Sequence, residues 1–269
     1  MRSWTIYQLK EADLRISSPR ADLVEAEVRR LRTALEAFIE RQPAFRAALV
    51  PIDLLDGAPP IAVAMADAAR ACGLGPMAAV AGAVAQAAAE AALAKGAGEA
   101  IVENGGDTWI ASPTEVTVGL HAGRHALSGR LALRIPPDRL PLSVCSSSGR
   151  FGHSLSFGDC DLATVVAQSG ALADAAATLA ANCVRTVDDV EPTLERVMAI
   201  PGVDGVLIVE NDRVGVAGNL PQLVQCADPD FALKTRHRWV GPAHGLDQPL
   251  NENGNEVYTV SFPFRRPPG

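Results

Sequence analysis

The residues best suited to chemistry lie on a helix predicted over residues 170–183. Asp174, Thr178 and Asn182 follow one another at spacings of four residues, so they share one face of that helix. The segment contains no Lys, Arg or Glu. A carboxylate and a hydroxyl one turn apart on an otherwise apolar helix are typical oxygen ligands for a hard cation such as Mg²⁺. The structural alternative is that Thr178 bonds back to its own helix.

A second Ala-rich helix, predicted over residues 75–95, carries a similar polar stripe. The stripe consists of Gly82, Gln86 and Glu90, again spaced by four residues. Small side chains allow two helix backbones to approach closely. Two such helices predict a shared buried seam, and the alternative is close packing with stray polar residues facing outward.

A Gly-Gly-Asp cluster follows a strand predicted over residues 100–103. Its residues are Asn104, Gly105, Gly106 and Asp107. Paired glycines adopt backbone conformations closed to other residues and let a ligand approach the chain. The interpretation we favour is a tight turn between two strands, because this composition is common in turns. A ligand-binding loop is the alternative.

A hydroxyl-rich cluster follows a strand predicted over residues 142–145. Backbone amides and hydroxyls of this kind can hold phosphate or sugar oxygens. The cluster lacks the Gly-Lys-Ser/Thr of a Walker A loop and the Gly-x-Ser-x-Gly of a nucleophile elbow. Its histidine is the candidate catalytic residue, although a lone histidine more often satisfies a local hydrogen bond. The residues are Ser146, Ser147, Ser148, Gly149 and His153.

Composition limits the class of protein. The chain has 269 residues, 48% of them hydrophobic, enough for one large core or a core split between two lobes. A net charge of −7 argues against nucleic acid as a partner. Five widely spaced cysteines without a Cys-x-x-Cys pair predict reduced thiols and a cytoplasmic location. The N-terminus has no apolar signal core, and Gln86 and Glu90 interrupt the longest apolar run, so we expect no membrane span.

Periodicity and turn residues predict the remaining elements. Helices and strands are interleaved without strict βαβ alternation, which favours an α+β fold: a mixed β-sheet packed with Ala-rich helices, in a single domain over residues 1–269. Residues 226–255 are rich in Asp, Pro, Gly and Asn and predict a long loop or appendage. We expect a hairpin over residues 4–16, helices over 19–39, 61–72 and 190–198, and strands over 116–120, 131–135, 162–167, 206–209, 214–216 and 257–262.

The order of these motifs resembles the ApbE superfamily, most closely its uncharacterised ApbE-like branch. The resemblance covers about residues 10 to 220, and the Asp-x-x-x-Thr helix and the Gly-Gly-Asp turn are its most portable parts. ApbE enzymes are Mg²⁺-dependent FAD:protein FMN transferases. They split the FAD pyrophosphate and attach FMN to a threonine of a target protein. The resemblance therefore implies a small flavin ligand, FAD or FMN, and a magnesium ion.

The resemblance also implies roles for particular residues. Asp174 and Thr178 would bind the metal, helped by a backbone carbonyl from the small-residue helix. Residues 146–149 would match the family's Thr-Ser-Gly loop, and residues 104–107 its Gly-Gly turn beside the flavin. The metal would stabilise charge on the phosphates during an in-line attack.

Two departures from the family pattern bear on the reaction. The lysine of the transferases' small-residue helix corresponds to Ala81, and the long histidine loop is reduced to residues 153–158. The fold and the metal site therefore carry over better than flavin transfer does. The alternatives are a non-catalytic flavin- or nucleotide-binding or scaffold protein, or an enzyme of another cofactor's biosynthesis on the same fold. Neither the oligomeric state nor the acceptor follows from the sequence.

Overall fold

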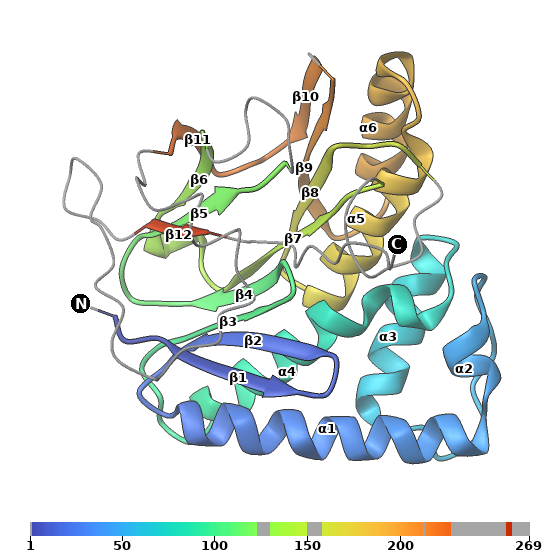
Figure 1. The fold of residues 1–269 in the computed structure, drawn as a ribbon, viewed down its shortest axis with the longest axis vertical. Helices are drawn as coiled ribbons and strands as arrows, with labels where there is room; N and C mark the ends of the chain where they lie inside the picture. The colour runs from blue at the N-terminus through green and yellow to red at the C-terminus, as the bar shows by residue number, and fades with distance from the viewer. Residues whose placement is uncertain (1, 123–129, 150–157, 212, 227–256, 260–269) are drawn as a thin grey trace, which may run out of the picture.

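The molecule is built in three layers, seen in a computed structural model (Figure 1). The structure describes residues 2–122, 130–149, 158–211, 213–226 and 257–259. A layer of helices covers one face of an eight-stranded sheet, and a four-stranded sheet packs against the other face. The predicted α+β class is therefore confirmed.

The larger sheet has the strand order β1-β2-β3-β4-β7-β8-β9-β10, and every neighbouring pair is antiparallel. The β1–β2 and β9–β10 hairpins were both predicted from the sequence. The strands are β1 (Thr5–Leu9), β2 (Ala12–Ser17), β3 (Ala100–Asn104), β4 (Asp107–Ala111), β7 (Leu142–Ser147), β8 (Leu162–Ala167), β9 (Val203–Glu210) and β10 (Arg213–Gly218).

The smaller sheet has the order β11-β6-β5-β12. Its β12–β5 pair is parallel and its other pairs are antiparallel, so mixed pairing occurs in the smaller sheet, whereas the sheet on which the Ala-rich helices pack is wholly antiparallel. The predicted long loop lies outside the described residues except for Cys226, as do residues 260–262 of the predicted last strand. The strands are β11 (Gln222–Gln225), β6 (Leu131–Ile135), β5 (Val116–Leu120) and β12 (Val257–Thr259).

The helical layer has an outer and an inner part. Helix α1 runs along the base of the molecule in Figure 1 and buries the apolar stripe that its sequence predicts. Helices α4 and α5 are the inner pair and pack directly on β3, β4, β7 and β8. The helices are α1 (Ala21–Arg41), α2 (Ala44–Ala47), α3 (Pro60–Ala71), α4 (Val80–Leu93), α5 (Gly170–Cys183) and α6 (Val190–Met198).

Two hydrophobic cores lie on opposite faces of the larger sheet. Strand side chains alternate between faces, so Cys145 of β7 packs in the core beneath the helices and Val144 packs in the core between the sheets. The same alternation decides which polar residues of β4 and β7 can face α4 and α5.

One segment of the described residues, Pro76–Leu93, is long and apolar enough to cross a membrane by length and composition alone. It comprises a 3₁₀ turn and α4, and it packs against α1, α5, β3 and β4. These contacts are those of a core helix.

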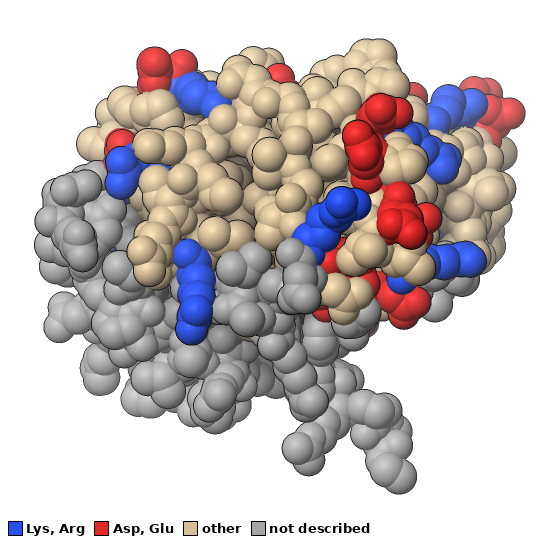
Figure 2. All heavy atoms as spheres, turned by 90° about the horizontal axis from the view of Figure 1, so that it is seen from above, with Lys and Arg blue, Asp and Glu red and all other residues tan. Residues whose placement is uncertain are grey.

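Charged side chains of both signs are mixed around a broad uncharged area on the face shown in Figure 2.

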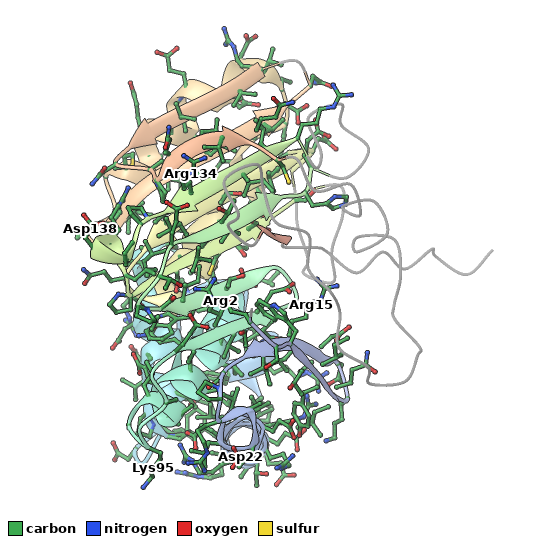
Figure 3. All side chains as sticks on the ribbon, turned by 90° about the vertical axis from the view of Figure 1, so that its left-hand side faces the viewer. Arg2, Arg15, Asp22, Lys95, Arg134 and Asp138 are labelled. Atoms are coloured by element: carbon green, nitrogen blue, oxygen red, sulfur yellow. The ribbon has the colours of Figure 1, made fainter. Side chains whose placement is uncertain are left out.

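The N-terminal segment is fixed to the middle of the molecule by Arg2. Its Nε lies 2.8 Å from Oε1 of Glu99, and its Nη2 donates a hydrogen bond to Ser112 Oγ over 2.7 Å. In Figure 3, Arg2 lies between Asp22 on the helical side and Arg134 on the smaller sheet. The contact orders the chain leading into β1.

Candidate metal and ligand site

At the α4–α5 crossing the two helix backbones lie very close together. A Cβ atom on Gly82 would lie 2.2 Å from the Gly170 carbonyl oxygen, and one on Gly170 would lie 2.4 Å from the Gly82 carbonyl oxygen. The Gly170 amide donates a hydrogen bond to Gln86 Oε1 over 2.7 Å. The predicted seam between the two small-residue helices is thus confirmed, and two of its three α4 residues face α5.

Asp174 lies at this crossing. Its Oδ2 accepts a hydrogen bond from the Gly82 amide over 2.9 Å, and the residue is only 9% exposed. Burial raises the pKa of Asp174 to about 7, although hydrogen bonds from the Gly82 and Ala81 amides act in the opposite direction. The aspartate is held inside the protein by backbone donors, as its apolar helix predicted.

Thr178 lies one turn further along α5 and is 8% exposed. Within the described part of the chain, its hydroxyl makes no hydrogen bond, not even to its own helix. The back-bonded alternative is therefore not realised, and the hydroxyl oxygen remains available to a ligand.

Asp107 begins β4, directly after a two-residue hairpin turn. Gly105 and Gly106 have φ values of 66° and 113°, and Asn104 pairs with Asp107 across the turn. Positive φ at both central positions requires residues such as glycine, so the favoured interpretation as a turn is confirmed. Asn104 Nδ2 donates to the Ala81 carbonyl over 3.2 Å and joins the turn to α4.

The Asp107 carboxyl lies on the helix-facing side of the sheet, near Asp174. Burial raises the pKa of Asp107 well above its usual range, and the Asp174 charge raises it further. Its Oδ1 is buried and has no hydrogen-bond partner among the described residues. The pKa of Cys145 is also raised, first by burial and then by Asp107 and Asp174, so the thiol lies beside both acids.

The hydroxyl-rich cluster divides between the two faces of the sheet. Strand β7 extends to Ser147, two residues beyond the prediction, and Ser147 shares the helix-facing side with Cys145. Ser146 points the other way and shares a 2.8 Å hydrogen bond with Thr164 Oγ1. Ser148 Oγ and the Gly149 amide both donate to the carbonyl of Cys160, two residues before β8, over 3.0 and 2.8 Å.

His153, the candidate catalytic residue, lies outside the described residues, as does the rest of segment 150–157. Its role stays a prediction.

The oxygen groups around α5 fit a magnesium ion. No three His, Cys, Asp or Glu side chains gather as a metal cluster in the described ranges. Mg²⁺ needs only one or two carboxylates and completes its shell with water and phosphate oxygens. Asp174 and Thr178 supply a carboxylate and a hydroxyl, and the buried Asp107 Oδ1 nearby has no hydrogen-bond partner among the described residues.

Two contributions to this site were missed by sequence reasoning. The amides of Ala81 and Gly82 orient Asp174, and Cys145 lies between the two acids. The polar stripe of the Ala-rich helix was a signal for Gly82. No pattern in the sequence indicated that Cys145 would lie beside Asp174.

The chain resembles solved flavin transferases in fold. It superimposes on the apo form of the flavinyl transferase ApbE of Pseudomonas stutzeri with a TM-score of 0.52 at 11% identity, covering 81% of this chain and 96% of the other. The flavin transferase ApbE of Vibrio cholerae gives 0.50 at 10% identity, covering 81% and 97%. At such identities the likeness establishes an ApbE-like fold and nothing further.

The family model described as "AbpE bacteria" matches residues 3–201. A UPF0280 protein of Methanocaldococcus jannaschii is 38% identical over 199 residues, 72% of this chain and 80% of the relative. A UPF0280 protein of Methanothrix thermoacetophila is 42% identical over 193 residues, covering 71% and 81%. The chain therefore belongs to this ApbE-like family, which includes the UPF0280 proteins.

Proposed function

We propose that this protein binds Mg²⁺ at Asp174 and Thr178 and uses it to hold the phosphates of a flavin nucleotide, FAD or FMN. The observation that carries the proposal is the buried Asp174 carboxyl, which the Gly82 amide orients at the α4–α5 crossing. A bound cation would supply positive charge to the phosphate oxygens. The family relation and the flavin transferases of the same fold support a flavin ligand.

The protein groups divide the work of holding such a ligand. Asp174 supplies negative charge, and the Gly82 amide fixes the direction of its carboxylate. Thr178 supplies a neutral oxygen one turn away. Burial of Asp174 and Thr178 strengthens the electrostatic interactions of their side chains.

Binding without flavin transfer is the second candidate, and one observation favours it. Ala81 stands where the transferases resembled by the sequence have a lysine, and its carbonyl accepts a hydrogen bond from Asn104. No cation is supplied by α4 at that position. A nucleotide-binding or scaffold role, or the processing of a related cofactor, follows from the same site. The five cysteines, all among the described residues, form no disulfide with one another, which supports the cytoplasmic location that we also propose.

A melting experiment followed by product analysis tests the proposal. We expect FAD with Mg²⁺ to raise the melting temperature, because ligands that bind the native state stabilise it. The shift should disappear in Asp174→Asn. Incubation with FAD and Mg²⁺, followed by mass spectrometry for FMN and AMP, then separates processing from binding. If no flavin nucleotide raises the melting temperature with or without Mg²⁺, the proposal is wrong.

A further inference from the structure

One carboxylate oxygen beside the proposed metal site has no hydrogen-bond partner among the described residues. Asp107 is 7% exposed, and its Oδ1 accepts no hydrogen bond from the described residues. A buried polar atom without a partner loses its hydrogen bonds to water and gains none in return, and the cost is greater when the group is charged. Such an atom is rare in a native protein and calls for a ligand or ion.

The position of Asp107 is set by the turn before it, and hydrogen bonds with the Cys145 thiol and the Ser146 backbone reach its carboxyl while Oδ1 is left without a partner. The Gly105-Gly106 turn and the pairing of Asn104 with Asp107 hold it at the first position of β4. The bond from Asn104 to the Ala81 carbonyl attaches that turn to α4. The hairpin therefore delivers a carboxylate to the same crossing where the Gly82 amide orients Asp174.

The surroundings of the pair are acidic. Neither Asp107 nor Asp174 forms an ion pair with Lys or Arg in the part of the chain that the structure describes. Glu103, on the opposite side of β3, adds further negative charge near Asp107. Two like charges at one buried location favour a counter-ion or a proton between them, and oxygen ligands of this type suit a hard divalent cation.

We propose that Asp107 is a second carboxylate ligand of the cation that Asp174 and Thr178 bind. This rests on the proposed function, and it reassigns Asp107 from the flavin to the metal. The site then has two carboxylates and one hydroxyl, from β4 and two successive turns of α5. Its remaining ligand positions are left to water and phosphate oxygens.

Direct binding of Mn²⁺ to the full-length chain tests the inference without using activity. The free Mn²⁺ signal in electron paramagnetic resonance reports the affinity, measured with and without FAD. We expect Asp107→Asn to weaken binding by about tenfold to a hundredfold, and Asp174→Asn to do the same or more. Because both acids act on one ion, the double variant should lose less than the sum of the two effects.

Asp161→Asn is the matched control. Asp161 is also a buried carboxylate, 5% exposed, but its Oδ2 accepts a hydrogen bond from the Asn211 amide over 2.8 Å. Its loss should leave Mn²⁺ affinity unchanged. Asp107→Ser provides a second variant of the proposed ligand, and circular dichroism checks the fold of each protein.

The outcomes separate the two proposals. If Asp107→Asn and Asp107→Ser bind Mn²⁺ within twofold of the wild type while Asp174→Asn does not bind, Asp107 is not a ligand and the proposed function stands. If the wild type itself binds no Mn²⁺, with or without FAD, both proposals are overturned.

Discussion

Two pairs of buried acids in this molecule are satisfied in different ways. In the first pair, Glu210 Oε2 accepts from the Asp161 amide over 3.2 Å, and Asp161 Oδ2 accepts from the Asn211 amide over 2.8 Å. Asn211 also donates its side-chain amide to Glu210 Oε1 over 2.7 Å. These acids tie the end of β9 to the start of β8, and protein donors account for them.

In the second pair, Asp174 has backbone donors but Asp107 retains a buried oxygen without one. The comparison teaches that burial of an acid does not by itself mark a site. A buried acid marks a candidate site when it has an oxygen without a hydrogen-bond donor and lies next to another acid. The reason is that a buried charge needs a donor, a proton or a cation.

The largest expected effect is on the pH dependence of stability without divalent cations. The pKa of the Asp174 carboxyl is raised from its ordinary value of 3.8 to about 7 in the folded protein. Between these two pH values the carboxyl is therefore protonated in the folded protein and ionised in the unfolded chain. Stability therefore falls as pH rises from about 4 to 7, by on the order of 4 kcal/mol. Asp174→Asn should flatten this fall and stabilise the cation-free protein at pH 8.

Urea denaturation in EDTA at pH 5 and pH 8 measures the effect. Asp161→Asn is the contrasting variant: it weakens the acceptor of the Asn211 amide and should destabilise the protein at pH 8. If both variants shift stability at pH 8 in the same direction, the two pairs do not differ as described.

Widening the α4–α5 crossing should have the next largest effect. In Gly82→Ala the new Cβ would lie 2.2 Å from the Gly170 carbonyl oxygen, so the helices must separate. We expect a loss of about 1–3 kcal/mol in unfolding free energy, together with loss of the FAD and Mg²⁺ melting shift. Gly98→Ala is the control, since its Cβ would meet nothing within 4 Å. Equal stability of the two variants would contradict the close crossing.

Removing the side chain that bridges the helices should have a smaller effect. Gln86→Leu leaves the Gly170 amide without its acceptor and should cost about 1 kcal/mol in denaturant unfolding. Glu90→Gln, at the exposed end of the same stripe, should change stability by less than about 0.5 kcal/mol. A silent Gln86→Leu would show that backbone contact alone holds the seam.

The smallest effects should separate the two faces of the sheet at β7. Ser146→Ala breaks the bond to Thr164 and should cost about 1 kcal/mol without changing the FAD and Mg²⁺ melting shift. Ser147→Ala, on the helix-facing side, should leave stability nearly unchanged and reduce that shift. The reverse result in melting experiments would move the ligand to the inter-sheet face, where the Ser146 hydroxyl lies.

Local elements with a clear period were predictable from the sequence. Helix α1 shows its apolar residues at helical spacing, and the β1–β2 hairpin shows partial alternation. Strand β4 was not among the predicted strands, although the predicted turn at Gly105 and Gly106 implies a strand after it. Helix α2 and strand β11 were also missed, and each has only four residues.

Some of the candidate site residues were likewise predictable from local sequence, and others were not. The sequence by itself identified Asp174 and Thr178, because polar residues at helical spacing among alanines are visible without a structure. It also indicated the Gly-Gly turn, because positive φ at two successive positions demands glycine. These are local properties, decided within one or two turns of chain.

Only the tertiary structure decided which groups meet. Gly82 and Asp174 are 92 residues apart in the chain, yet their hydrogen bond orients the candidate metal ligand. Sheet alternation and pairing decided that Ser147 and Asp107 face the helices while Ser146 faces away. Contacts of this kind depend on how closely two helices pack against each other on a sheet. That distance is decided by packing across the whole core. No local pattern in the sequence contains it.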